Sequence, residues 1–242
     1  MDFSVAPNPA VPYRLAYADE HLLVADKPAG VVTQPGKKHE RDSLLNALFA
    51  TYGHTLQNLG LARDWGLLHR LDKETSGLVM VALRNRAYED LRRQFEDRRI
   101  HKVYWALVQG QPRPAQGVVQ KPIAEVVGLR KKAVIQRDGQ QAITAYRTLA
   151  SAGGVSLMEA RPKTGRLHQV RVHFAALGHP LLGETLYGAW RGLPRVPRLC
   201  LHAAQLSFVH PETGRRLTVL SPWPHDLAST LRRFDLPAPS SP

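Results

Sequence analysis

In LLHRLDKETSGLVMVAL, residues 67–83, a short charged stretch lies between two apolar runs. The runs GLLHRL and GLVMVAL are typical of buried β-strands, and we expect strands on both sides of a charged loop. The loop contains Arg70, Asp72, Lys73 and Glu74. A rigid strand end is a good mount for a catalytic group, so Asp72 is a candidate for catalysis. Alternatively, Asp72 pairs with Arg70 or Lys73, or caps the turn through its own backbone.

Further apolar runs predict more strands, at residues 22–25, 101–110, 143–149, 155–160, 199–208 and 217–219. Two helices are expected at residues 43–52, with Asp42 as cap and Gly53 as end, and at residues 85–99, with Asn85 as cap. Strands cluster and do not alternate regularly with helices. The sequence therefore predicts an α+β fold with a mixed, mostly antiparallel central sheet, flanked by helices and loops.

Both ends of the chain are rich in Pro, Ala and Ser. We expect residues 1–11 and 236–242 to be flexible. Between them there is no internal repeat and no long linker. This continuity predicts a single domain over residues 12–235.

The chain of 242 residues has 33 Lys plus Arg against 20 Asp plus Glu, a formal charge of +13. An excess of this size indicates an anionic partner, and nucleic acid is the leading candidate. The alternative is a general preference for arginine on the surface. The charge thus points to RNA or DNA without identifying a site.

Cellular location is indicated by what the sequence lacks. Cys200 is the single cysteine, so no disulfide can form within the chain, which fits a reducing compartment. The first residues do not resemble a secretory signal, and no apolar run is long enough to cross a bilayer. We expect a cytoplasmic protein that does not bind membranes.

Several classes of chemistry have no motif here. The sequence contains no Gly-rich Walker loop, no dinucleotide-binding fingerprint and no G-x-S-x-G elbow. His168 and His173 are five residues apart, a poor spacing for one metal on either a helix or a strand. The sequence therefore predicts a reaction that uses ordinary side chains and no metal.

A second polar constellation lies in RPKTGRLHQVRVHFAALGHPLLGETLYG, residues 161–188. We expect a turn at residues 163–165 and then a helix that ends at Gly178. One apolar face of this helix is formed by Leu167, Val170, Phe174 and Leu177.

Arg171 falls at the edge of that apolar face. A guanidinium at the edge of a core needs a carboxylate, unless its stem packs and its head reaches water. Arg166 and His168 lie at the helix start, where backbone N–H groups can bind a phosphate.

Five blocks of the sequence, in order, resemble the RluA-type pseudouridine synthases. They are DEHLLVADKPAGVVTQPG (19–36), HRLDKETSGLVMVA (69–82), KVYWALVQG (102–110), the segment 161–188 and RLCLHAAQLSFVHPETG (198–214). The resemblance implies the pseudouridine synthase catalytic fold and the conversion of uridine in RNA to pseudouridine, without cofactor or metal. In this reaction the C1′–N1 bond breaks, the uracil rotates and C5 joins C1′.

The resemblance also assigns roles to residues. Asp72 corresponds to the essential aspartate, as nucleophile or base, and Arg171 to the arginine that pairs with it. Tyr104 corresponds to the tyrosine that stacks on the flipped base and helps remove the C5 proton. Arg70 corresponds to the arginine that helps fill the space of the flipped nucleotide, and Leu201 to a pocket-lining residue. Whether Asp72 attacks C1′ or C6, or removes the C2′ proton, stays open.

The chain departs from the family pattern at Glu184, where the family usually has Asp. It also resembles the short members without an N-terminal S4-type RNA-binding domain, and we expect a monomer. The expected substrate is 23S rRNA, with tRNA, or both RNAs, as the alternative. Two other readings are a glycosidase-like hydrolase, which would need two flanking carboxylates, and a non-catalytic RNA-binding or ribosome-assembly module.

Overall fold

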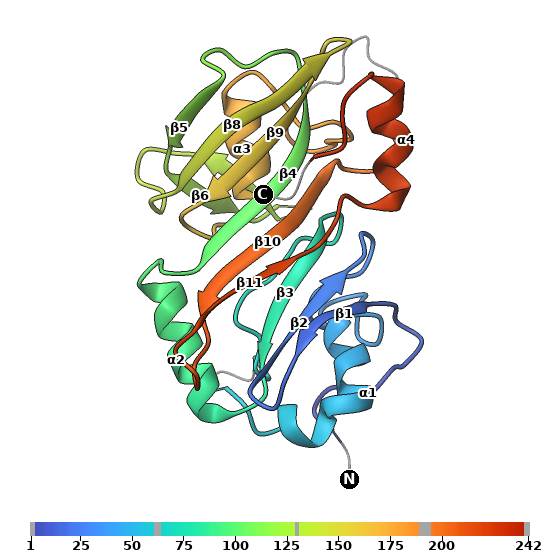
Figure 1. Ribbon diagram of the computed structural model, residues 1–242, viewed down its shortest axis with the longest axis vertical. Coiled ribbons are helices and arrows are strands. Elements are labelled where there is room, and N and C mark those ends of the chain that lie inside the picture. The colour runs from blue at the N-terminus through green and yellow to red at the C-terminus, as the bar shows by residue number, and fades with distance from the viewer. Residues whose placement is uncertain (1–2, 61–63, 129–130, 189–194, 240–242) are drawn as a thin grey trace. The chain divides into compact units, whose positions relative to one another are not determined.

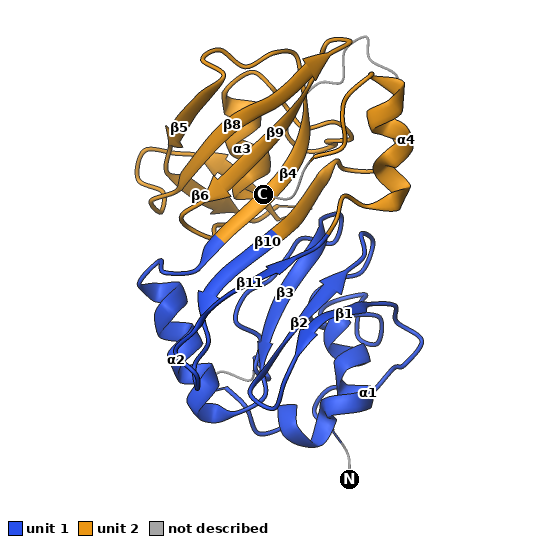
Figure 2. Cartoon of the chain, in the orientation of Figure 1, with its two compact units in different colours: residues 1–101, 205–221 blue, residues 102–204, 222–242 orange. Residues whose placement is uncertain are grey.

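The computed structural model describes residues 3–60, 64–128, 131–188 and 195–239 (Figure 1). The chain groups into two compact units (Figure 2). Unit 1 consists of Met1–His101 and Gln205–Ser221, and unit 2 of Lys102–Ala204 and Pro222–Pro242. The expectation of one catalytic domain over residues 12–235 stays a prediction.

Unit 1 is built on a sheet in which β1 with β2, β2 with β3, and β10 with β11 pair antiparallel. Its strands follow the order β1-β2-β3-β10, and β11 pairs with β10. The elements are β1 (Arg14–Ala18), β2 (Leu22–Lys27), α1 (Leu44–Leu56), β3 (Ser76–Ala82), α2 (Asn85–Glu96), β10 (Leu201–Val209) and β11 (Arg216–Leu220). Strand β10 begins in unit 2 and continues into unit 1.

Strand β3 is buried over its whole length, which explains its unbroken apolar sequence. Leu78 and Met80 on one of its faces pack in a cluster that includes Leu91 of α2. Val79 and Val81 on the other face are fully buried as well. The strand therefore anchors the loop that precedes it, which contains Asp72.

Unit 2 has a second antiparallel arrangement, in the order β4-β9-β8-β5, and a separate hairpin β6-β7. Its elements are β4 (His101–Gln109), β5 (Gln116–Gln120), β6 (Ile123–Val126), β7 (Lys132–Ile135), β8 (Ile143–Ala152), β9 (Val155–Pro162), α3 (Gln169–Ala176) and α4 (His225–Arg233).

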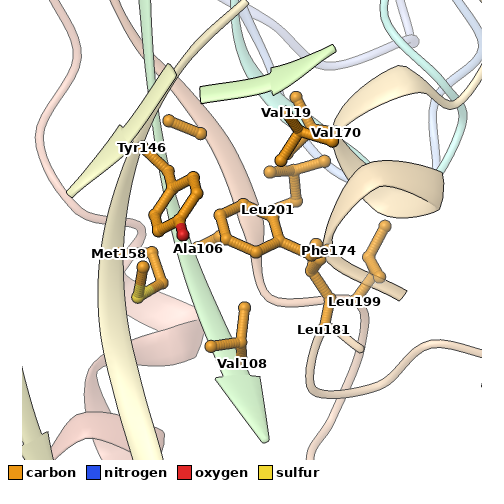
Figure 3. Packing of buried hydrophobic residues seen from close by; sticks show 11 residues of the cluster. Ala106, Val108, Val119, Tyr146, Met158, Val170, Phe174, Leu181, Leu199 and Leu201 are labelled. Carbon is orange, nitrogen blue, oxygen red and sulfur yellow. The ribbon is translucent and has the colours of Figure 1, made fainter. Parts of the chain in front are cut away.

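Alternating residues of β4 and β9 pack on opposite faces of the unit 2 strands. On one face, Ala106 and Met158 join Val170 and Phe174 of α3 in the cluster of Figure 3. On the other face, Leu107 and Leu157 pack with Leu227 and Leu231 of α4. The two helices thus belong to opposite faces of the same strands.

The α+β prediction is confirmed, and each strand predicted outside the opening segment overlaps a strand of the structure. The run GLLHRL is the exception. In it, Leu67 forms only an isolated bridge with Val81, and the amide of Met80 donates to Nε2 of His69 (3.0 Å). Because the imidazole takes the place of a backbone carbonyl, strand pairing cannot continue past this point.

Helix α1 differs from the prediction at both ends. Its cap is Ser43, not Asp42, and Ser43 forms a reciprocal capping box with Asn46. The helix continues past Gly53 to Leu56, and the missing side chain of Gly53 leaves room for the ring of Phe3, 2.9 Å from the position that a Cβ would take. Part of the N-terminal segment expected to be flexible therefore packs on α1, and Val5 is buried too.

Helix α3 begins later than the sequence suggested, since His168 adopts a left-handed backbone conformation (φ 50°) directly before it. Leu167 accordingly leaves the predicted apolar face and packs near Val172 in another cluster.

For α2, Asn85 is the first helical residue and not a side-chain cap. Five further elements were not predicted from the sequence: β1, β5, β6, β7 and α4. None of the helices in the described ranges is both long and apolar enough to span a bilayer.

Candidate active site

Asp72 is half-buried at the turn before β3 in unit 1. Its carbonyl oxygen accepts the N–H of Thr75 (3.1 Å), which closes the turn. Leu71 on one side of Asp72 is buried, whereas Lys73 on the other side is exposed. Arg70 is exposed in the same segment.

The loop after β2 holds the backbone on both sides of Asp72. The Thr33 hydroxyl donates to the Leu71 carbonyl (2.8 Å) and accepts the Leu71 N–H (3.1 Å). On the other side, the Gly30 N–H donates to the Lys73 carbonyl (2.7 Å). The position of the Asp72 backbone therefore depends on contacts more than thirty residues away along the chain.

Lys27 supports this loop from inside. It is fully buried, and its Nζ donates to the carbonyl oxygens of Pro28 (2.9 Å) and Val31 (2.6 Å). The carbonyl of Lys73 lies 3.5 Å from the same Nζ. Neither Lys27 nor Thr33 was predicted from the sequence to have a role, although a lysine that ends a buried apolar strand is itself a signal.

In unit 2, Arg171 is withdrawn from water. Its side chain is 3% exposed and pairs with Glu184, which is 2% exposed. Nε and Nη2 of Arg171 each donate to a different carboxylate oxygen of Glu184, both over 2.8 Å. The structure thus confirms that this guanidinium needs a carboxylate and excludes the alternative in which its head reaches water. The sequence analysis noticed Glu184 only as a departure from the family pattern.

The negative charge of Glu184 is stabilised by backbone N–H groups as well as by Arg171. Its Oε1 also accepts the N–H groups of Thr185 (2.9 Å) and Leu186 (2.8 Å). Burial raises the pKa of Glu184, but the hydrogen bonds and charge of Arg171, with these N–H groups, hold the pKa below its ordinary value. The carboxylate therefore stays ionised, and the guanidinium has a fixed orientation.

Tyr187 connects Arg171 with His168. The guanidinium carbon of Arg171 lies 5.5 Å from the centre of the Tyr187 ring. The Tyr187 hydroxyl accepts the N–H of Ala133 (2.8 Å) and lies 2.5 Å from Nδ1 of His168. The Tyr187 hydroxyl therefore links the backbone at Ala133 with the imidazole of His168.

A buried polar network fixes the start of α3. The side chain of Gln169 accepts from the Thr164 hydroxyl (2.7 Å) and donates to the Thr144 hydroxyl (2.9 Å). Thr144 lies 2.9 Å from Nδ1 of His173, whose Nε2 donates to the Lys121 carbonyl (3.0 Å). Burial lowers the pKa of His173, so the neutral ring is favoured.

The same network occupies part of the expected phosphate site. The backbone N–H of Arg166 donates to Gln169 Oε1 (3.1 Å), and Nε of Arg166 donates to the Gln141 carbonyl (3.2 Å). Phosphate binding by Arg166 and His168 stays a prediction.

Tyr104 and Leu201 both belong to the cluster that packs against α3: Leu201 is buried in it, and Tyr104 is partly buried against it. Lys102 precedes Tyr104 by two residues and lies on the same face of β4. Its Nζ donates to the Thr164 carbonyl (3.2 Å), and burial lowers its pKa to about 8. The sequence analysis missed this cation near the start of α3.

The structure therefore brings Tyr104, Leu201 and Arg171 into unit 2, beside or on α3, and places Asp72 and Arg70 in unit 1. The pair between Asp72 and Arg171 stays a prediction. Within the described part of the chain, no group of three or more His, Cys, Asp or Glu side chains is arranged to hold a metal ion.

Comparison with known proteins decides the family. The family model described as RNA pseudouridylate synthase matches residues 21–176. The chain belongs to this family. Its members are isomerases, and the RluA-type relationship inferred from five sequence blocks is confirmed.

Relatives of this pseudouridine synthase chain match over most of their own length. An uncharacterized RNA pseudouridine synthase of Mycobacterium bovis is 39% identical over 221 residues, 90% of this chain and 71% of the relative. The dual-specificity RNA pseudouridine synthase RluA of Escherichia coli is 36% identical, over 86% of this chain and 92% of the relative. The solved structure of human RNA pseudouridylate synthase domain containing 4 has a TM-score of 0.75 and 29% identity, covering 93% of this chain and 94% of that one.

Proposed function

We propose that this chain isomerises uridine to pseudouridine in structured RNA, with Asp72 as the catalytic nucleophile or base. The observation that carries the proposal is the mounting of Asp72, whose neighbours Leu71 and Lys73 are both held by the loop after β2. Such anchoring limits the positions that the carboxylate can sample, which is what an attacking group requires.

The reaction conserves the atoms of the nucleotide. The C1′–N1 bond breaks, the uracil turns, and a C5–C1′ bond forms, while C5 releases a proton and N1 gains one. Asp72 takes part as nucleophile at C1′ or C6 or as base at C2′. Tyr104 stacks on the extruded base and helps to remove the C5 proton, and Leu201 lines the pocket. Arg70 helps to fill the space that the base leaves.

Arg171 pairs with Asp72 in this proposal, and Glu184 positions Arg171. The pair with Glu184 occupies Nε and Nη2, so the Nη1 side of the guanidinium faces away from Glu184. In this proposal the Arg171 guanidinium provides a fixed positive partner for the Asp72 carboxylate in the pocket that holds the uracil. Glu184 also restricts the rotation of the Arg171 guanidinium.

The proposed substrate is 23S rRNA, and a relative in Zymomonas mobilis, 38% identical over 91% of this chain, is a ribosomal large subunit pseudouridine synthase D. The second candidate is tRNA, alone or with rRNA. It is supported by the dual-specificity relative, of which 92% is covered. The excess of positive charge suits either RNA.

Tritium release from RNA labelled at C5 of uridine tests the reaction and its substrate together. Purified protein is incubated with 23S transcripts and, separately, with bulk tRNA transcripts, without added metal or nucleotide. We expect release from the 23S transcripts, and release from tRNA as well would favour dual specificity. If neither RNA releases tritium although both bind, the catalytic proposal fails and the binding-module reading takes its place.

A further inference from the structure

A hollow of about 260 Å³ lies over β8 and β9. These two strands are paired in unit 2 (Figure 1). It is lined by Ala145, Tyr146, Arg147, Glu159 and Arg161. None of these residues takes part in the proposed reaction.

The hollow belongs to the face of the strands that points away from α3. Tyr146 and Ala160 pack in the cluster with α3, so their neighbours Arg147 and Glu159 point to the opposite face. Leu157, two residues before Glu159, packs with α4 on that opposite face. The hollow therefore lies on the α4 face of these strands, further along β9 than Leu157. The cluster that includes Tyr104 lies on the other face.

Glu159 is the centre of the group. Its side chain is 4% exposed, and it stands directly opposite Arg147 on β8 and Trp105 on β4. Nη2 of Arg147 lies 3.0 Å from one carboxylate oxygen, and Nε of Arg161 lies 2.8 Å from the other. One buried carboxylate thus holds two guanidinium groups.

Both arginines also face water, with side chains that are 54% and 55% exposed. Each contributes one nitrogen to Glu159. A guanidinium has five N–H donors, so Glu159 leaves most donors of both half-exposed groups unused. The group as a whole carries one net positive charge.

Stability alone does not explain this arrangement. Removing a carboxylate from water costs several kcal/mol, and an apolar residue of similar volume often stabilises a fold as well as a buried ion pair does. What Glu159 provides in return is orientation, since it fixes two flexible side chains on adjacent strands. Oriented guanidinium groups with outward donors are suited to phosphate, which they bind through paired N–H groups.

We propose that Arg147 and Arg161, held by Glu159, bind a backbone phosphate of the substrate RNA outside the nucleotide that reacts. This inference rests on the proposed function for the identity of the RNA. It adds a contact on the face opposite Tyr104, so it concerns a flanking part of a structured RNA. The site contributes to binding and not to the chemical step.

The first test measures binding of a fluorescein-labelled 20-base-pair RNA duplex by fluorescence anisotropy at several salt concentrations. We expect the double variant Arg147→Gln, Arg161→Gln to raise Kd about tenfold and to lower the salt slope by about 1, because the loss of one phosphate contact changes the slope by about 1. The control is Arg232→Gln, Arg233→Gln, which removes two exposed charges from α4. If both double variants bind the duplex alike, the proposal is overturned.

A second variant tests orientation against charge. Glu159→Gln keeps the side-chain shape and adds one unit of positive charge to the hollow. If the carboxylate matters because it orients the two arginines, the duplex binds more weakly. Tighter binding would mean that bulk charge alone attracts the RNA, which contradicts an oriented site.

Tritium release separates failure of this site from failure of the proposed function. With a long structured RNA, we expect the arginine double variant to raise KM and leave kcat within about twofold of wild type. A fall in kcat as large as the rise in KM would contradict a role confined to binding. If wild type releases no tritium, the anisotropy comparison still decides the site.

A third measurement compares binding of a poly-glutamate peptide to wild type and to the arginine double variant. If the double variant loses peptide binding but keeps its RNA affinity, the proposal is overturned in favour of an acidic protein segment as ligand.

Discussion

Unit 2 contains two arginine–glutamate clusters that differ in which partner is withdrawn from water. In the pair of Arg171 with Glu184, both side chains are buried, at 3% and 2% exposure. In the group around Glu159 the carboxylate is buried, at 4%, but Arg147 and Arg161 are about half exposed. The same two residue types therefore build an interior contact in one place and a surface contact in the other.

The difference shows how burial of the cation decides what a pair can do. A buried guanidinium cannot reach a ligand in solvent, so Arg171 can act only on a group brought to it. A half-exposed guanidinium with a buried anchor presents its remaining donors to whatever approaches. This difference supports the proposals that Arg171 acts on Asp72 and that the Glu159 group binds RNA.

Loss of charge at each glutamate is the change with the largest expected effect. Glu184→Gln leaves Arg171 buried without its carboxylate, which should lower the free energy of unfolding by about 3–5 kcal/mol. Glu159→Gln leaves two arginines that still reach water, and the expected loss is about 1 kcal/mol or less. Urea unfolding followed by circular dichroism measures both. Equal losses would break the comparison.

Replacement of arginine by lysine should affect catalysis only in the cluster that contains Arg171. Arg171→Lys keeps the charge but removes the two-point contact with Glu184, and we expect kcat for tritium release to fall about a hundredfold with little change in KM. Arg147→Lys should leave kcat unchanged. A similar loss of kcat in both variants would mean that the Glu159 group also acts in the chemical step.

The buried hydroxyl of Thr33, which holds the backbone beside Asp72, is a neutral counterpart to the two buried glutamates. Thr33→Val keeps the shape but removes the hydroxyl that bonds both backbone groups of Leu71. We expect kcat to fall about tenfold, because the backbone beside Asp72 gains freedom and buried polar groups lose a partner. Thr213→Val, at a hydroxyl in the β10–β11 turn that accepts the Arg215 N–H, is the matched control. Unchanged kcat in Thr33→Val would separate Asp72 from this loop.

A smaller effect is expected from pH, through His173 on the helix of Arg171. Burial lowers the pKa of His173 in the folded protein, whereas the unfolded chain takes up this proton as the pH falls through about 6.5. The stability that the neutral ring contributes is therefore present above pH 6.5 and is lost below it, by up to about 1.4 kcal/mol per pH unit for one proton. Urea unfolding at pH 7.5, 6.5 and 5.5 should show a steeper loss for wild type than for His173→Gln. Parallel losses would mean that His173 does not titrate differently in the two states.

Features that depend on local pattern could be predicted from the sequence. Strand β4 was predictable because it is a long run of apolar and aromatic residues, and the placement of Arg171 at the edge of a core follows from helical periodicity. Helix α4 was missed, although Leu227, Leu231 and Phe234 follow a helical spacing and pack in one cluster. Its short, polar sequence hid that signal.

Features that depend on distant contacts could not be predicted. Thr33 and Leu71 are 38 residues apart, so nothing near Asp72 in the sequence indicates what holds it. His69 ends strand pairing through a ring nitrogen, which no propensity scale describes. The partner of Arg171 lies 13 residues further along, and Glu184 gave only the weak signal of an unusual residue in a family block.

The most direct test of the account is the replacement of Asp72 by asparagine. Wild type and Asp72→Asn are compared in tritium release, on whichever RNA the wild type accepts, and in binding to the same RNA. The account predicts that Asp72→Asn binds the RNA with near wild-type affinity and releases no tritium above background. Release by Asp72→Asn at a rate close to that of wild type would contradict it, because the reaction would then not depend on this carboxylate.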